Sequence, residues 1–143
     1  MPTRSAEAVW TGDLMEGDGT MSFGSGAFEG PYSFGSRMED GPGTNPEELI
    51  GAAHAGCFSM QLSGVLSEAG HPPQSIQTRA RVSFEKSDGG WAITGIRLST
   101  EGDVPGIDAS AFAEHANVAK EICPVSKALA GVKINLETSL AGG

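Results

Sequence analysis

The sequence predicts an α+β domain in which antiparallel sheets pack around a long central helix, and three observations support this fold class. Many of the 21 glycines fall before residue 44, which indicates short strands joined by turns. A single apolar segment at 43–70 carries helix signals at both ends. The rest of the chain is patterned as a hairpin, a helix and a strand. With 143 residues, the chain is long enough for a single domain, 1–143, with its own core.

The N-terminal third is expected to form a small antiparallel meander. Short stretches of strand-forming residues occur at 5–11, 20–23 and 27–34, and glycine-rich turns separate them. The stretch at 36–43 is polar and rich in glycine and proline, so we expect it to be a loop that leads into the long helix.

Both ends of the long helix are marked by particular residues. Asn45 is a good N-cap, Pro46 suits the first helical position, and Glu48 follows the cap by three residues, as in a capping box. Gly70, which precedes His71 and two prolines, ends the helix.

The faces of this helix indicate that it is enclosed. One row of side chains is apolar and a second row contains only small residues. The apolar row consists of Ile50, Ala53, Cys57, Met60 and Gly64, and the small row consists of Ala52, Gly56, Ser59 and Ser63. Because small residues allow another backbone to approach closely, we expect the helix to lie in a core or in a subunit interface.

The C-terminal half is expected to add a hairpin, two helices and a last strand. Residues 75–86 alternate between apolar and polar side chains, which predicts a half-buried strand. A turn signal at 87–90 joins it to a strand at 91–100. After a break at 104–106, the expected elements are a helix at 108–122 capped by Asp108, a short helix at 125–130 and a strand at 132–140.

Composition and charge exclude several classes of partner. The net charge is −9 and no cluster of lysine and arginine offsets it, so we expect no nucleic acid or membrane partner. No apolar run reaches the length of a membrane span, and the first residues lack the apolar stretch of a signal peptide, so we expect a cytoplasmic protein. In the cytoplasm a cysteine pair is more often catalytic, redox-active or metal-binding than a structural disulfide.

The two cysteines are the strongest candidates for chemistry. Cys57 by itself would be interpreted as an inert core residue of the long helix. Cys123 directly precedes Pro124, which opens the short helix, so its thiol lies at a helix N-terminus that favours the thiolate. A low-pKa thiol near a second thiol is the arrangement of a peroxide-reducing enzyme, in which one cysteine becomes a sulfenic acid and the other resolves it as a disulfide.

The motifs around these cysteines resemble the OsmC branch of the OsmC/Ohr family of thiol peroxidases. The resemblance extends from Trp10 to Leu140 and is carried by GTNPEELIGAAHAGCFSM at 43–60, VPGIDAS at 104–110 and CPVSKAL at 123–129. It implies reduction of hydroperoxides, organic ones preferred, by an intertwined homodimer that acts in defence against oxidative or osmotic stress. It further implies that the protein has no bound cofactor and depends on an external dithiol reductant.

The resemblance also implies roles for four residues. Cys57 matches the peroxidatic cysteine, Cys123 the resolving cysteine, and Arg37 with Glu47 an Arg–Glu pair beside the reactive thiol. A guanidinium there would stabilise the thiolate, and a carboxylate would hold the guanidinium by a bidentate pair. Glu47 and Cys57 are ten residues apart on one helix, hence about 15 Å along its axis. We therefore predict that Arg37 and Glu47 serve the Cys57 of the other subunit, with the active site at the dimer interface.

Two further sites have alternative interpretations. His54, one turn before Cys57, is either a base for that thiol or a satisfied, partly buried histidine. A zinc site built from both cysteines and a histidine is possible in number, but the sequence has no ligand pair spaced as in C-x-x-C.

The substrate pocket and the function class have alternatives as well. The candidates to line a pocket for an alkyl chain are Ile50, Phe58 and Met60, with Phe34 or Met38 from the preceding segment. The alternative to an enzyme is a non-catalytic redox sensor or a small-molecule-binding protein on the same fold, in which oxidation of the cysteine pair changes the conformation.

Overall fold

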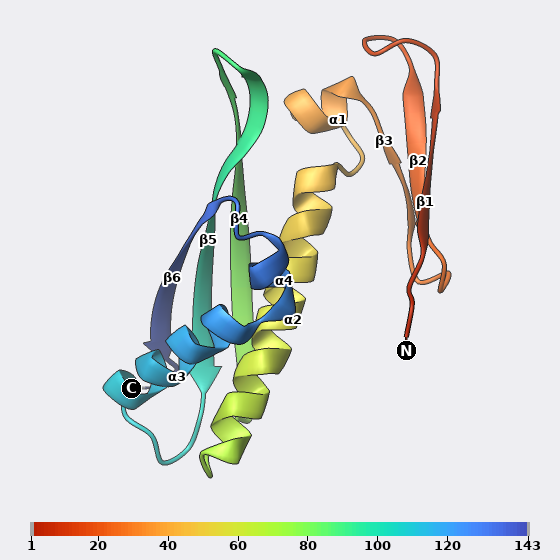
Figure 1. Cartoon of the computed structure of the whole chain (residues 1–143). Coiled ribbons are helices and arrows are strands. Elements are labelled where there is room, and N and C mark those ends of the chain that lie inside the picture. Colours follow the sequence, from red (N-terminus) through yellow and green to blue (C-terminus); the bar gives the residue numbers. More distant parts are fainter. Residues whose placement is uncertain (1, 143) are drawn as a thin grey trace. The chain divides into compact units, whose positions relative to one another are not determined.

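Three short strands form an antiparallel meander in the order β1-β2-β3, as the sequence predicted (Figure 1). They are β1 (Ala6–Thr11), β2 (Asp18–Phe23) and β3 (Glu29–Tyr32). The computed structural model describes residues 2–142, which fall into two compact units that divide between Leu49 and Ile50. The meander belongs to the first unit. The prediction of a single domain over 1–143 stays a prediction.

A short helix, α1 (Phe34–Met38), follows the meander in a stretch for which the sequence predicted strand and loop, so this part of the prediction was wrong. The Ser36 N–H donates to the Ser33 hydroxyl at 3.1 Å, and the Ser33 N–H donates to the Ser36 hydroxyl at 2.9 Å. A serine here takes the place that glutamate or glutamine has in the usual capping box. For this reason the helix start was not recognised in the sequence.

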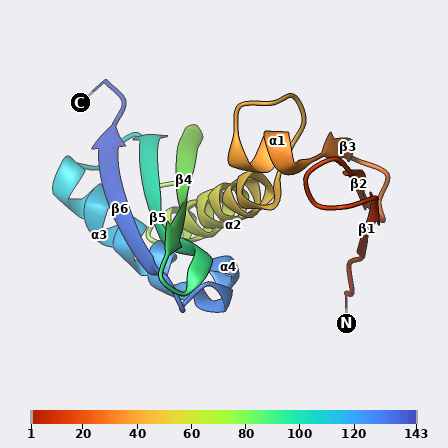
Figure 2. The same cartoon turned by 90° about the horizontal axis from the view of Figure 1, so that it is seen from above.

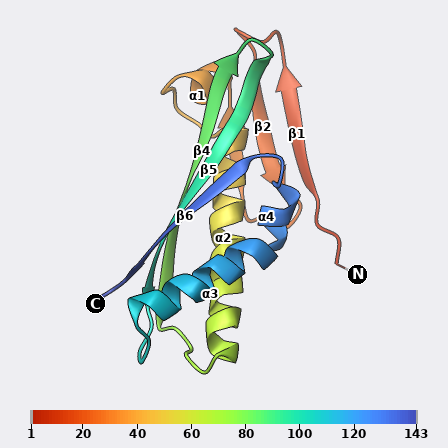
Figure 3. The same ribbon diagram turned by 60° about the vertical axis from the view of Figure 1, so that its left-hand side comes forward.

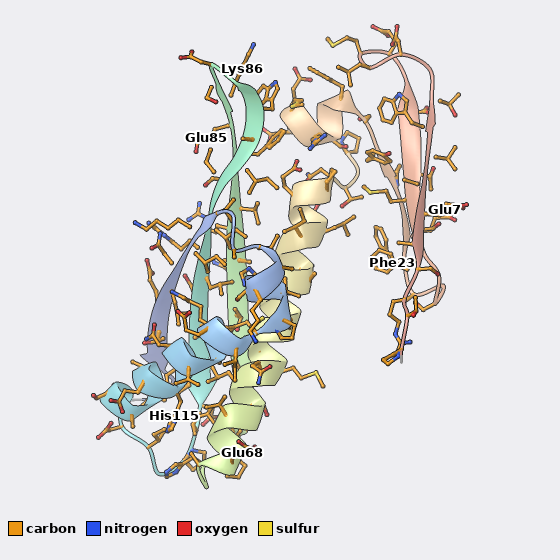
Figure 4. All side chains as sticks on the ribbon, viewed as in Figure 1. Glu7, Phe23, Glu68, Glu85, Lys86 and His115 are labelled. Carbon is orange, nitrogen blue, oxygen red and sulfur yellow. The ribbon has the colours of Figure 1, made fainter. Side chains whose placement is uncertain are left out.

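The long helix α2 (Pro46–Glu68) begins and ends where the sequence predicted. The Glu48 N–H donates to Asn45 Oδ1 at 2.7 Å, which confirms Asn45 as the N-cap. At the other end, marked by Glu68 in Figure 4, Gly70 has φ 89°, a left-handed conformation that glycine adopts without a steric penalty.

The second unit contains a sheet in the order β4-β5-β6. The strands β4 (Ser75–Ser87) and β5 (Gly90–Asp103) form the predicted antiparallel hairpin, near whose tip Figure 4 labels Glu85 and Lys86. The strand β6 (Lys133–Leu140) pairs with β5 in parallel, so the prediction of purely antiparallel sheets was wrong for this pair. The chain between β5 and β6 is helical and crosses over, which returns β6 to the sheet in the same direction as β5.

Two helices, α3 (Ala109–Ile122) and α4 (Pro124–Ala128), make up this crossover. The Asp108 carboxylate accepts a hydrogen bond from the Ala111 N–H at 2.8 Å, which confirms the predicted cap of α3. Within the second unit, α2 and α3 cover the same face of the sheet, as the views in Figures 1, 2 and 3 agree. The buried residues of α3 are Phe112, Ala116 and Ala119, and Ala109 of the predicted face is exposed.

The core of the second unit is built on a face of α2 that the predicted rows did not contain. Phe58, Leu62 and Leu66, four residues apart in succession, are completely buried, whereas Met60 of the predicted apolar row is 81% exposed. The remaining core residues come from β5, α3 and the segments that follow them: Ile96, Leu98, Val104, Phe112, Ala116, Ala119 and Cys123. Among the described residues of the second unit, α2 is therefore enclosed on the face that carries these large side chains, because the size of the side chains, and not the number of apolar ones, decides which face is buried.

The helix α2 also corrects the expectation about membrane-spanning length. It is long and apolar enough, by length and composition, to cross a membrane, with a mean hydropathy of 1.3 in its 18-residue window. Alanine raises this mean without adding a large side chain. Core helices of soluble proteins meet the same criterion, and α2 contributes three of its large side chains to a core, so the criterion alone does not indicate a membrane span.

Candidate active site

The two cysteines meet in the second unit, as expected from the sequence. Cys57 lies near the middle of α2, Cys123 lies at the junction of α3 and α4, and their Sγ atoms are 3.2 Å apart. Both are free thiols; Cys123 is completely buried and Cys57 is partly exposed. A molecule that arrives from solvent therefore reaches Cys57 first, and Cys123 is close enough to form a disulfide with it after a small movement.

The position of Cys123 follows from the proline after it. The Cys123 N–H donates to the Ala119 carbonyl at 2.9 Å and closes α3, while its own carbonyl accepts from the Lys127 N–H at 3.0 Å and opens α4. Pro124 occupies the first position of α4, where its missing N–H costs nothing, and it forces the preceding residue out of helical geometry. The backbone thus turns at Cys123 and directs its thiol toward α2, on which Cys57 lies.

The pKa values of the two thiols move in opposite directions. Burial raises the pKa of Cys57, and the neighbouring Cys123 raises it further, although the Val125 N–H lowers it. Burial also raises the pKa of Cys123, but hydrogen bonds from the Ser126 N–H, the Cys57 thiol, the Ser126 hydroxyl and the Val125 N–H together bring it below its ordinary value. As two thiols, Cys123 donates to Cys57. An ionised Cys123 would accept from the Cys57 thiol instead, so the hydrogen bonds around Cys123 favour a negative charge on Cys123 over one on Cys57.

This charge distribution is the reverse of what a peroxidatic Cys57 requires, because the thiolate is the nucleophile. Within the described part of the second unit, none of the groups that shift the pKa of Cys57 is positively charged. A reactive Cys57 therefore needs a positive charge that residues 50–142 do not supply.

His54 lies one turn before Cys57 and is completely buried, not partly buried as expected. Its Nε2 lies 2.7 Å from the Ser126 hydroxyl, so the geometry pairs it with Ser126 and does not support the interpretation of a base for Cys57. Ser126 is a site residue that the sequence reasoning missed. The signal that would have found it is its place three residues after Cys123 in the first turn of α4, from which its hydroxyl contacts the Cys123 thiol.

Burial lowers the pKa of His54 below its ordinary value of 6.5, and this predicts a pH-dependent stability. Below that pH the unfolded chain binds a proton at His54 that the folded chain does not bind. The free energy of unfolding should therefore fall by about 1.4 kcal/mol per pH unit below the ordinary value, until the folded pKa is reached. Urea unfolding at a fixed protein concentration between pH 7 and pH 5 measures this slope, which His54→Gln should reduce. Equal slopes in the two proteins would contradict a neutral, buried His54.

Arg37 and Glu47 meet in the first unit through the bidentate pair that the sequence predicted. Arg37 Nε donates to Glu47 Oε1 and Arg37 Nη2 to Glu47 Oε2, each at 3.0 Å. The Glu47 side chain is 9% exposed and that of Arg37 37% exposed. The carboxylate therefore anchors the guanidinium and fixes its plane.

The first unit holds this pair through hydrogen bonds around the start of α2. The Ser36 hydroxyl donates to the Thr44 carbonyl at 2.7 Å, and the Asn45 side-chain amide donates to the Ser36 carbonyl at 3.1 Å. These bonds tie α1, which carries Arg37, to the first turn of α2, which carries Glu47. The short helix missed in the sequence is therefore the element that positions Arg37.

Two other features predicted from the sequence are a pocket for an alkyl chain and a metal site. Of the residues proposed to line an alkyl pocket, Phe58 is completely buried in the core and Met60 is exposed, so these two do not share one pocket. In the described residues 2–142, no group of three or more histidines, cysteines, aspartates or glutamates is placed to hold a metal ion.

Known proteins of one family are similar to this chain over most of its length. Residues 39–137 match the profile of a family described as OsmC-like protein. Peroxiredoxin OsmC of Escherichia coli (strain K12) is 54% identical over 127 residues, which cover 88% of this chain and 89% of that protein. Organic hydroperoxide resistance protein OhrB of Bacillus subtilis (strain 168) is 36% identical over 104 residues, covering 71% and 74%. The crystal structure of B. subtilis OhrB aligns with a TM-score of 0.74 at 28% identity, covering 94% of this chain and 97% of that one.

Proposed function

This chain belongs to the OsmC family, and we propose that it is a thiol-dependent peroxidase that reduces organic hydroperoxides to alcohols, in defence against oxidative or osmotic stress. One observation carries the proposal: two free thiols lie 3.2 Å apart, with Cys57 reachable from solvent and Cys123 buried beside it. The similar proteins are named peroxiredoxin OsmC and organic hydroperoxide resistance protein, which supports the same chemistry here.

The reaction begins at Cys57. Its thiolate attacks the terminal oxygen of the hydroperoxide, the O–O bond breaks, and the alkoxide leaves and takes up a proton to give the alcohol. Cys57 becomes a sulfenic acid. Cys123 then attacks the sulfenic sulfur, the S–O bond breaks, water is released and the disulfide forms. For this the two sulfurs must approach from 3.2 Å to about 2.0 Å.

An external dithiol completes the cycle by thiol–disulfide exchange and returns both cysteines to thiols. The sulfurs carry the electrons themselves, so the proposal includes no bound cofactor. Because this cycle needs reduced thiols, we assign the protein to the cytoplasm, where thiols are kept reduced. The net charge of −9 makes nucleic acid and membranes poor partners for it.

The positive charge that Cys57 needs is assigned to Arg37. The guanidinium is permanently charged, and the bidentate pair with Glu47 fixes its orientation. Placed beside Cys57, it would lower the pKa of that thiol, reverse the charge distribution within the cysteine pair and polarise the peroxide oxygen.

We propose that the positive charge comes from the partner subunit of a homodimer, so that Arg37 and Glu47 of one chain act on Cys57 of the other. Glu47 and Cys57 lie ten residues apart on α2, about 15 Å along its axis, which is too far for one guanidinium fixed at Glu47 to touch both. The active site would then lie at the subunit interface.

Exposed apolar surface in both units supports such a dimer. On α2, Met60 is 81% exposed and lies between the exposed glycines 56 and 64, which form a face that allows another helix to approach closely. In the described residues 2–49, no large apolar side chain is completely buried, and Val9 and Phe23 are 56% and 39% exposed. A partner subunit would remove this surface from water.

Turnover with a dithiol separates the enzyme from the redox sensor. The purified protein should consume cumene or tert-butyl hydroperoxide over many turnovers in the presence of dithiothreitol, measured as peroxide lost per mole of protein. A protein that reacts once and then stops with every dithiol tried would favour the sensor and contradict the peroxidase.

A further inference from the structure

The proposed peroxide chemistry leaves one buried polar pair unused. His54 is completely buried and Ser126 is 7% exposed. His54 Nε2 lies 2.7 Å from Ser126 Oγ. The second ring nitrogen, Nδ1, is buried without a hydrogen-bond partner among the described residues. Burying a polar group without a hydrogen-bond partner costs folding free energy, and His54 Nδ1 is such a group. A functional role would explain why the pair is kept.

The unpartnered nitrogen fixes the tautomer of His54. If Nδ1 carried the proton, it would be a buried donor with no acceptor. An unprotonated Nδ1, which leaves only an acceptor without a donor, costs less free energy. The proton therefore sits on Nε2, which donates to the Ser126 hydroxyl oxygen at 2.7 Å. Burial lowers the pKa of His54, so the ring is neutral and keeps this tautomer at neutral pH.

The tautomer in turn directs the Ser126 hydroxyl. Because Ser126 Oγ accepts from His54, its own proton is available for another acceptor. That acceptor is the sulfur of Cys123, which interacts with both the hydroxyl and the N–H of Ser126. The result is a chain of hydrogen bonds in which His54 donates to Ser126 and Ser126 donates to Cys123. Among residues 50–142, Cys57 is the one titratable group that directly shifts the pKa of Cys123.

We propose that His54 and Ser126 are positioning residues for the resolving step, in which His54 holds the Ser126 hydroxyl as a hydrogen-bond donor to the Cys123 sulfur. This inference rests on the proposed peroxidase function. The Cys123 thiolate attacks the sulfur of the Cys57 sulfenic acid, the S–S bond forms and the S–O bond breaks. Hydroxide leaves with the bonding electron pair, and the proton that Cys123 released to solvent when it ionised balances it, so the net product is one molecule of water. The Cys123 sulfur is oxidised and the sulfenic sulfur is reduced, so no further oxidant is needed.

The first test measures the pKa of Cys123 itself, and it does not depend on peroxidase activity. In the Cys57→Ser protein, the thiolate absorbance at 240 nm reports Cys123 alone as the pH is varied. Adding Ser126→Ala should raise the pKa of Cys123 by about one, a tenfold loss of thiolate, because a hydrogen bond to the charged sulfur is removed. Ser126→Thr keeps the hydroxyl and should restore the original value, and His54→Phe should raise the pKa in the same direction as Ser126→Ala.

The second test separates the two chemical steps in the protein with both cysteines. One equivalent of cumene hydroperoxide is added, and peroxide loss and disulfide formation are followed separately. Ser126→Ala and His54→Phe should slow disulfide formation about tenfold more than they slow peroxide loss, and Ser126→Thr should be close to wild type.

The outcomes distinguish the two proposals. If both steps slow equally, or if the pKa of Cys123 does not change in Ser126→Ala, the positioning role is wrong. If the wild-type protein consumes no peroxide, the proposed function is wrong, while the pKa measurement still decides whether His54 and Ser126 act on Cys123. Should His54→Phe fail to fold, the pair Ser126→Ala and Ser126→Thr decides the question alone.

Discussion

Replacing Cys57 by serine is expected to reduce peroxide turnover at least about a thousandfold, because a serine hydroxyl is not ionised at neutral pH and cannot replace the thiolate nucleophile. The measurement is the rate of cumene hydroperoxide loss with excess dithiothreitol, at the same protein concentration for the variant and the wild type. Cys57 is partly exposed and its neighbour Cys123 is completely buried, so the substitution removes the thiol that solvent reaches.

The matched control is Cys123→Ser, which leaves the first chemical step intact. This protein should consume about one equivalent of peroxide per subunit and accumulate a sulfenic acid that dimedone traps, without forming a disulfide. The comparison has a clear contrary outcome, because Cys123 is the thiol whose pKa is lowered within the pair. If Cys57→Ser still consumes peroxide and Cys123→Ser does not, the roles of the two cysteines are exchanged.

Replacing Arg37 by methionine is expected to slow peroxide attack about a hundredfold at neutral pH, through the loss of thiolate and of charge stabilisation in the transition state. Part of this loss should be recovered at higher pH, because Cys57 then ionises without the guanidinium. Glu47→Gln leaves the guanidinium in place but weakens its anchor, so we expect a smaller loss of about tenfold. The measurement is the second-order rate constant of peroxide loss as a function of pH.

Arg79→Met is the matched control for this prediction. Arg79 lies on the exposed face of β4, and its replacement removes the same charge from the protein at a site away from both cysteines. Its rate constant should equal that of the wild type. Equal losses in Arg37→Met and Arg79→Met would mean that overall charge, and not a guanidinium at the active site, controls the reaction.

Much of the fold is predictable where local chemistry alone decides the structure. The caps Asn45 and Asp108, the stop at Gly70 and the alternation in β4 all act through neighbours a few residues apart, and the structure confirms each of them. The pairing of β6 with β5 depends on a crossover of two helices, and the direction of that pairing was predicted wrongly.

The buried face of α2 shows a second reason for failure. Apolar and small residues occur nearly all round this helix, so its periodicity does not select one face. The partners on β5 and α3 make that selection, and they choose the large side chains Phe58, Leu62 and Leu66. The core face is therefore a property of the packed unit and not of the helix sequence by itself.

The site was predictable to the extent that family motifs mark it. The resemblance named Cys57, Cys123, Arg37 and Glu47, and the structure brings the two cysteines together and, separately, the arginine and the glutamate. The contact between His54 and Ser126 joins residues 72 positions apart, and no local pattern signals it. The catalytic roles of these residues stay predictions until the variants are measured.

The central claim is that each active site takes Cys57 from one subunit and Arg37 from the other, and a mixed dimer tests it most directly. Arg37→Met and Cys57→Ser chains, each with a different affinity tag, are co-expressed, and the dimer that carries both tags is purified. Each parent dimer should be almost inactive. The mixed dimer contains one complete site, so it should show about half of the wild-type peroxidase activity per dimer. A mixed dimer no more active than its parents would mean that Arg37 does not act across the interface.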